Sequence, residues 1–300
     1  MKSKLFLIIS VGLLLFMSGC GTEELISQGP FKGGSEGLVL SFIEGAPYTS
    51  FSQGEIVSFK TLLSNKGEFD ISAGQAKVKL FGFSEDAWPA LNTNFVSNTL
   101  DLMGIDQTLE TGGENIISLG EGSYVKQIYG SYEQPIYARL CYPYETKLFS
   151  NVCMSSNKIK QTGVEICDIS GEKLISGAVS SGPIQVISLT ESYLSSTGIR
   201  FAFVIENKEG GKVYSIDRDC ESFGLMDEGK IKVEVIPSDV VCHFTTGQSN
   251  IGEVSLKEGS KTLICDKSII STDSYSDVIE LKISYKYETE ISTIMNVIGE

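Results

Sequence analysis

Histidine, tryptophan and basic residues are scarce in this sequence. One histidine and one tryptophan occur in 300 residues, and 24 Lys and Arg stand against 38 Asp and Glu, a formal net charge of −14. Because an acidic surface repels phosphate backbones, we expect no nucleic-acid partner and favour cations or basic proteins. The single histidine, His243, cannot complete a His-rich metal shell. We interpret it as a hydrogen-bonded strand residue beside Cys242.

No recognisable catalytic motif is placed in a catalytic context. Gly33, Ser35 and Gly37 form a G-x-S-x-G pattern, but they lie in a linker, whereas a nucleophile elbow needs a strand before it and a helix after it. Long helical stretches are also lacking, which disfavours a solute-binding protein built around a cleft between strands and helices. We therefore expect a protein that is not an enzyme.

The N-terminus has the features of a secretory signal. Two lysines in "MKSK" precede a largely apolar run of thirteen residues, "LFLIISVGLLLFM", and the small residues of "SGC" end in Cys20. A run of thirteen is too short for a transmembrane helix, which needs about 20 residues. The segment "MSGC" resembles the lipobox of prokaryotic lipoproteins, with Met17 where leucine is usual. The resemblance implies lipidation of Cys20 and a membrane as partner, the alternative being ordinary cleavage that leaves Cys20 free or paired.

The remaining cysteines form an even set. Six cysteines suit disulfides in an oxidising compartment, and no two have the two-residue spacing of a zinc knuckle. They are Cys141, Cys153, Cys167, Cys220, Cys242 and Cys265. We expect three disulfides, an extracytoplasmic location and no cofactor.

Alternation of apolar and polar residues predicts an all-β chain of sandwiches. The predicted strands are residues 37–43, 56–65, 76–83, 114–119, 135–142, 183–189, 199–207, 230–236, 261–265 and 278–287. Between the cysteine and the first strand, residues 21–37 are rich in glycine and acids and lack periodicity, which predicts a flexible tether.

Three short phrases recur in the same order and indicate an internal duplication. They are Asn65-Lys66 with Asn207-Lys208, "SLGEGS" (118–123) with "SLKEGS" (255–260), and "YPYET" (142–146) with "YKYET" (285–289). We interpret the last pair as the terminal F–G hairpin of each repeat. In the first copy, a turn at residues 146–148 would place Cys141 opposite Cys153 and predicts a disulfide between them.

At these residues the chain resembles the Ig-like, CARDB-related modules of archaeal and bacterial surface lipoproteins. The resemblance rests on "LLSNKGEF", "VIENKEGG", "MSGC" and the hairpin that begins "CYPYET". It implies tandem Ig-like β-sandwiches and a non-catalytic surface role. We predict a signal peptide (1–19), a lipidated cysteine and tether (20–36), a first sandwich (37–156), a linker (157–179) and a second sandwich (180–300).

An Ig-like strand order also predicts the other disulfides. Cys167 precedes the first strand of the second repeat and Cys220 lies in its enlarged B–C loop, at the same end of the sandwich. Cys242 and Cys265 end strands that share the opposite end. The order therefore predicts the pairs Cys167–Cys220 and Cys242–Cys265.

Each repeat has an insertion in which function is sought, because loops on a rigid sandwich carry binding. In the first repeat the insertion holds Trp88, Phe95, Leu102 and Met103, which form either a flap over the core or a surface for a partner. In the second, Asp217, Asp219 and Glu221 alternate with other residues. They form either a solvated acidic loop or a calcium site.

These features together predict a membrane-anchored cell-surface protein that acts in binding, adhesion or envelope assembly. The alternative is an accessory subunit of an extracytoplasmic enzyme or transporter complex. The partner itself is not named by the sequence.

Overall fold

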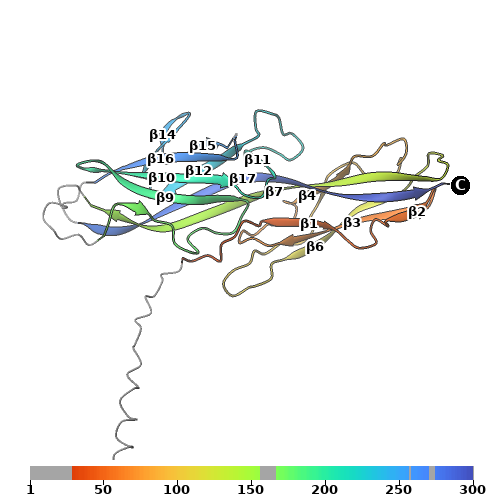
Figure 1. Cartoon of the computed structure of the whole chain (residues 1–300), viewed down its shortest axis with the longest axis horizontal. Helices are drawn as coiled ribbons and strands as arrows, with labels where there is room; N and C mark the ends of the chain where they lie inside the picture. Colours follow the sequence, from red (N-terminus) through yellow and green to blue (C-terminus); the bar gives the residue numbers. More distant parts are fainter. Residues whose placement is uncertain (1–28, 156–166, 257, 270–273, 300) are drawn as a thin grey trace, which may run out of the picture.

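The computed structural model describes residues 29–155, 167–256, 258–269 and 274–299, and its regular elements are strands (Figure 1). The described residues contain no helix. Each of the ten segments that alternation predicts overlaps a strand, which confirms the all-β class. Cys20 and the predicted signal peptide lie outside the described residues.

The strands form three sheets. The first has the order β1-β3-β6, with β1 (Leu38–Phe42), β3 (Ile56–Asn65) and β6 (Glu114–Ser123). The second has the order β14-β13-β16-β10-β9-β8, with β8 (Gly171–Glu172), β9 (Ile184–Ser195), β10 (Gly198–Asn207), β13 (Val241–Phe244), β14 (Gly247–Ser249) and β16 (Ser260–Ser268).

The third sheet runs along the whole molecule (Figure 1). Its main path is β15-β12-β17-β7-β4-β5, and β2 and β11 also pair with β17. The strands are β2 (Ser50–Ser52), β4 (Lys77–Phe81), β5 (Val96–Ser97), β7 (Ser131–Met154), β11 (Lys212–Tyr214), β12 (Lys230–Ile236), β15 (Ile251–Ser255) and β17 (Tyr275–Ile298). The first sheet packs on one half of this long sheet and the second sheet on the other, so the molecule has a first half and a second half.

Two strands of 24 residues, β7 and β17, belong to both halves. They pair antiparallel along their entire length, from Ser131 opposite Ile298 to Met154 opposite Tyr275. The start of β7 pairs with β4 in the first half, and the start of β17 pairs with β12 in the second half. Each strand then continues into the other half, so both long strands cross between the halves. Within the predicted linker at 157–179, Gly171–Glu172 form β8, which pairs with β9.

The prediction of two F–G hairpins is therefore wrong. Residues 146–148, where a turn was expected, are paired within the long strands, with Thr146 opposite Ile283 and Leu148 opposite Leu281. The two repeated phrases pair with each other instead: Tyr142 lies opposite Tyr287, and Tyr144 opposite Tyr285. Alternation is satisfied equally by a hairpin and by one continuous strand, so it did not separate the two arrangements.

The halves are related by a local two-fold arrangement centred on Pro143 and Lys286. These residues occupy the same place in the repeated phrase and lie opposite each other in the sheet. The flanking strands follow the same relation, since Val78 of β4 pairs with Leu140 and Val233 of β12 pairs with Ile283. The repeat at the Asn-Lys and Tyr-x-Tyr phrases is thus a structural duplication.

The repeated Asn-Lys and Tyr-x-Tyr phrases form equivalent contacts in the two halves. The Asn65 side-chain amide donates to the Phe69 carbonyl at 2.8 Å, and that of Asn207 donates to the Gly211 carbonyl at 2.7 Å. Each bond closes the loop that follows the strand. In the second half, Tyr287 reaches the same loop: its hydroxyl accepts from the Gly211 backbone N–H at 2.8 Å.

The third repeated phrase is not equivalent in the structure. "SLGEGS" ends β6, whereas "SLKEGS" covers the end of β15 and the start of β16. The pairing of β3 with β6 and of β10 with β16 makes Glu114 the counterpart of Ser260, so these phrases occupy opposite ends of matching strands. That match therefore does not belong to the structural duplication.

The predicted tether is also shorter than expected. Within residues 29–36, the backbone N–H groups of Gly29 and Phe31 donate to the carbonyls of Ser176 and Gly177 at 2.8 and 3.0 Å. The carboxylate of Glu68 accepts from the backbone N–H of Lys32 at 2.9 Å. These bonds hold residues that composition alone predicted to be flexible.

Candidate functional site

A disulfide joins the two halves near the centre of the molecule. Cys141 of β7 bonds to Cys220, in the loop between β11 and β12, across 79 residues of sequence. The predicted pairs Cys141–Cys153 and Cys167–Cys220 are therefore both wrong. The physical reason is the continuous β7, which places Cys141 and Cys153 far apart along one extended strand.

Acidic residues beside Cys220 strengthen this joint. Asp219 and Glu221 accept from the Lys77 ammonium group at 3.0 and 3.3 Å, and Lys77 lies opposite Cys141 in the sheet. The hydrogen bond from Lys77 lowers the pKa of Asp219, and the bond to Asp219 raises the pKa of Lys77. The disulfide and two ion pairs thus hold one loop of the second half against strands of the first.

This arrangement changes the interpretation of the proposed calcium ligands. Asp219 and Glu221 bind a lysine, and Asp217 lies exposed on the same loop. No group of three or more His, Cys, Asp or Glu that suits a metal ion occurs in the part of the chain that the structure describes. Asp219 and Glu221 therefore contribute to the joint between the halves.

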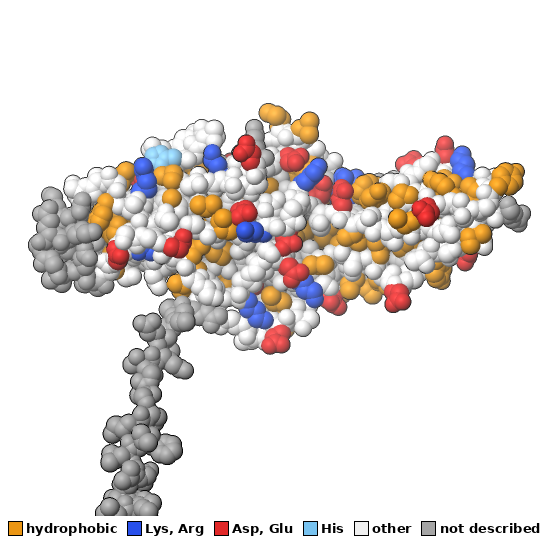
Figure 2. Space-filling model, in the orientation of Figure 1, with side chains coloured by type: hydrophobic (Ala, Val, Ile, Leu, Met, Phe, Trp, Pro, Cys, Tyr) orange, Lys and Arg blue, Asp and Glu red, His pale blue; other side chains and the backbone are white. Residues whose placement is uncertain are grey.

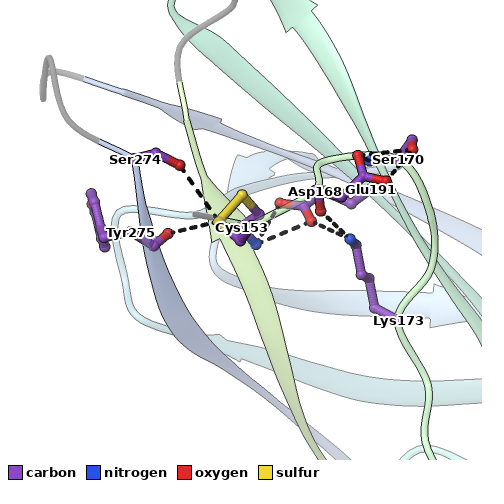
Figure 3. The surroundings of a disulfide bond; sticks show 8 residues. Cys153, Asp168, Ser170, Lys173, Glu191, Ser274 and Tyr275 are labelled. Carbon is purple, nitrogen blue, oxygen red and sulfur yellow. Dashed lines mark hydrogen bonds and ion pairs between the residues drawn. A yellow bond between two sulfur atoms is a disulfide. The ribbon is translucent and has the colours of Figure 1, made fainter. Parts of the chain in front are cut away.

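The second disulfide, Cys153–Cys167, lies beside a buried carboxylate (Figure 3). Glu191 of β9 is 2% exposed and accepts from the Cys153 backbone N–H at 3.0 Å. Lys173 provides its counter-charge at 3.2 Å. On the opposite side of the disulfide, the Cys167 sulfur lies 3.4 Å from the Tyr275 carbonyl oxygen.

Burial determines the protonation of Glu191. Removal from water raises the pKa of this carboxyl to about 7, although the Cys153 N–H and Lys173 both favour the charged form. Asp168, which accepts hydrogen bonds from Ser170, adds a further negative charge nearby. Glu191 is thus a buried group that titrates near neutral pH.

The third disulfide, Cys242–Cys265, confirms its prediction. The two cysteines lie directly opposite each other on β13 and β16. Beside them His243 bonds to Asp266 at 2.8 Å, and Asp266 also accepts from Arg200 at 2.8 Å. His243 is hydrogen-bonded in a strand, as its sequence context predicts.

The insertion of the first half covers the core. Trp88 is fully buried, and its ring packs against those of Phe51, Phe59 and Tyr124, with 5.7–5.8 Å between ring centres. Leu102 is fully buried as well. The flap interpretation is therefore confirmed for these two residues, and the interpretation of Trp88 and Leu102 as a partner surface is wrong.

The other two residues of that candidate surface do not form a patch with them. Phe95 is half-buried beneath the Lys79 ammonium group, 4.7 Å from the ring centre. Met103 is exposed. Apolar side chains this close in sequence therefore fall on both faces of the flap, with Trp88 and Leu102 in the core and Met103 in solvent.

Among the described residues, the most exposed apolar side chains lie in the loop between β11 and β12, and sequence reasoning did not select them. Leu225 is 92% exposed and Met226 84%. In Figure 2, hydrophobic side chains stand out at the top of the molecule over this loop. The available signal was two apolar residues between Gly224 and Asp227 in a segment typical of a surface loop.

Comparison with known proteins identifies no family. No family model matches the chain, and no curated protein matches it. Among solved structures, the secreted serine protease VesC from Vibrio cholerae is similar at 10% identity and a TM-score of 0.19, over 83% of this chain and 50% of VesC. The chain thus spans about half the length of that protein.

A chain from the triple jelly-roll and turret assembly of an archaeal virus is similar at 9% identity and a TM-score of 0.12, over 89% of this chain and 92% of that one. Likenesses of this size bear on neither fold nor function. Within the described residues, no helix is long and apolar enough to cross a membrane.

Proposed function

We propose that this protein is a non-catalytic, membrane-anchored protein of the cell surface that acts in binding, adhesion or envelope assembly. The observation that supports it best is the rigid joint between the two halves. Two 24-residue strands, the Cys141–Cys220 disulfide and the Lys77 ion pairs combine the halves into one elongated body (Figure 1). A rigid body of this kind suits the display of loops to a partner.

The compartment follows from the cysteines. Three disulfides use all six cysteines of the described residues, which indicates an oxidising, extracytoplasmic environment. The membrane anchor is the finer part of the proposal. It rests on the apolar segment before Cys20 and on the resemblance of "MSGC" to a lipobox.

The position of Gly29 bears on how an anchored molecule is presented. Gly29 and Phe31 are bonded to Ser176 and Gly177, in the segment between β8 and β9 of the second half. Only eight residues separate Cys20 from Gly29. An anchor at Cys20 therefore keeps Gly29 within about 30 Å of the membrane.

Fractionation of cells tests the proposal. Cys20→Ala is expected to move the full-length protein from the membrane fraction to the soluble extracytoplasmic fraction, because the lipid attachment atom is lost. Met17→Leu, which brings the segment closer to the usual lipobox, is the matched control and is expected to stay with membranes. Retention of Cys20→Ala in membranes, or protection of the protein from a membrane-impermeant label on intact cells, contradicts the proposal.

A further inference from the structure

The loop between β11 and β12 presents two apolar side chains at its tip. Leu225 and Met226 are 92% and 84% exposed, and we call this pair the apolar tip. The segment from Asn207 to Lys230, which contains β11 and this loop, is twice as long as the corresponding segment of the first half, from Asn65 to Lys77. The tip is thus a feature that breaks the symmetry of the duplication, as expected of a functional loop.

The tip is exposed although its base is firmly held. Phe223 stacks on Tyr214 with 3.8 Å between ring centres. Asp227 is buried and accepts from the Gly224 backbone N–H at 3.1 Å and from Arg218 at 3.0 Å. Nearby, Cys220 is joined to β7. A loop fixed in this way loses little conformational entropy when a partner covers it.

A groove begins at the foot of the tip. It has a volume of about 480 Å³ and is lined by Leu225, Leu256 and the glycines Gly210, Gly211 and Gly229. A second hollow of about 390 Å³ shares the backbone from Gly210 to Lys212. At Gly210 no atom lies within 4 Å of the place that a Cβ would take, so a peptide backbone can approach the chain closely there.

The walls of the two hollows are acidic. Four carboxylates line them, Glu209, Glu228, Glu288 and Glu290, against one lysine, Lys212. Glu288 is only 6% exposed, and the Arg139 guanidinium lies 3.7 Å from its carboxylate. Arg139 bonds more closely to Glu290, at 2.6 Å. Glu209 and Glu228 have no ion pair within the described residues.

We propose that the apolar tip and the two acidic hollows beside it dock a segment of a partner protein in which a basic side chain lies beside an apolar one. The apolar residue covers Leu225 and Met226, and the Lys or Arg enters between the carboxylates. The inference rests on the proposed binding function and names its site. Complementary charge around an apolar contact is the arrangement that gives protein interfaces their specificity.

The same charges disfavour a lipid surface as the occupant. Insertion of Leu225 and Met226 into a membrane would bring Glu209, Glu228 and Glu290 toward headgroups that are often anionic. A basic peptide gains from these carboxylates, whereas an anionic membrane is repelled by them.

Peptide binding to the full disulfide-bonded chain tests the proposal. The probes are a synthetic peptide of alternating lysine and leucine and a matched peptide of alternating glutamate and leucine. Calorimetry measures the affinity of each peptide, and the backbone amide chemical shifts of the protein locate the site. We expect the lysine peptide alone to bind, with shifts at residues 209–212 and 223–229. Leu225→Ser with Met226→Ser should weaken binding at least about tenfold, and Glu209→Gln with Glu290→Gln should do the same.

A control pair separates this site from general attraction to an acidic protein. Ile56→Ser with Ile116→Ser removes two exposed apolar side chains of the first half and should leave the affinity unchanged. Equal loss in this control, or shifts spread over the surface, overturns the proposal. So does tip-dependent binding to phosphatidylglycerol vesicles without peptide binding. Since Cys20→Ala fractionation tests the anchor separately, failure here leaves the proposed function standing.

Discussion

Tyr144 of β7 lies directly opposite Tyr285 of β17, and their rings are 5.9 Å apart in the buried centre of the long sheet. Tyr142 and Tyr287 form the neighbouring pair, with rings 6.0 Å apart. The repeated Tyr-x-Tyr phrase therefore meets its own copy where the halves join. Burial raises the pKa of Tyr285 well above its usual value, so these hydroxyls remain neutral hydrogen-bonding groups.

Removal of the Tyr287 hydroxyl should destabilise the joint. The hydroxyl accepts from the Gly211 N–H at 2.8 Å and donates to the Asn207 side chain at 3.1 Å. Tyr287→Phe leaves both groups without this partner and should lower the free energy of unfolding by about 1–3 kcal/mol. Chemical denaturation measures the loss. Tyr275→Phe, in the exposed start of the same strand, is the control and should change little.

The loop glycines that meet these tyrosines should not tolerate a side chain. A Cβ at Gly67 would overlap the Tyr144 hydroxyl, and one at Gly211 would lie 2.6 Å from the Tyr287 ring. Gly67→Ala and Gly211→Ala should each cost about 1–3 kcal/mol, because the buried ring has no free space to move into. In Gly224→Ala the new Cβ would lie 3.4 Å from Asp227, an ordinary contact. A similar loss in all three variants would show that the tyrosine contacts are not the cause.

The strands were predictable and their long-range pairing was not. Alternation locates the strand segments because each has one buried face. It does not say that β7 continues past Thr146, since a hairpin would bury the same residues. One local signal was available: residues 146–148 are Thr, Lys and Leu, without the Gly, Asn or Pro that a tight turn favours.

The candidate sites differ in the same way. Cys242 and Cys265 lie opposite each other on the adjacent strands β13 and β16, only 23 residues apart in sequence, so their pairing was within reach of local strand order. Cys141 and Cys220 meet only because the long strands cross between halves, which the sequence pattern does not contain. Leu225 and Met226 were missed because apolar residues are buried by default, and their exposure depends on the fixed base of the loop.

The disulfides should differ in their contribution to stability. Cys141–Cys220 spans 79 residues and Cys153–Cys167 spans 14, so the first restricts the unfolded chain more. Paired Cys→Ala substitution of either bridge should cost about 2–4 kcal/mol, with the larger loss for Cys141–Cys220. Non-reducing peptide mapping of the unmodified protein should recover both linked peptides. A Cys141–Cys153 peptide would contradict the continuous β7.

Stability should fall as pH rises through neutrality because of Glu191. The folded-state pKa of Glu191 is raised to about 7 by burial, against an ordinary value of 4.5. The folded state therefore binds a proton more tightly than the unfolded state. The resulting stabilisation is fully present below pH 4.5 and is lost as pH rises through 7, by up to about 3 kcal/mol.

Glu191→Gln tests this assignment, because glutamine keeps an acceptor for the Cys153 N–H and does not titrate. Unfolding free energies measured from pH 4.5 to 8 should vary less in this variant than in the unmodified protein. Glu133→Gln, an exposed carboxylate of β7, should keep the original slope. If Glu191→Gln also keeps that slope, the carboxyl is not the group that titrates, and the ion pair with Lys173 holds Glu191 charged throughout this range.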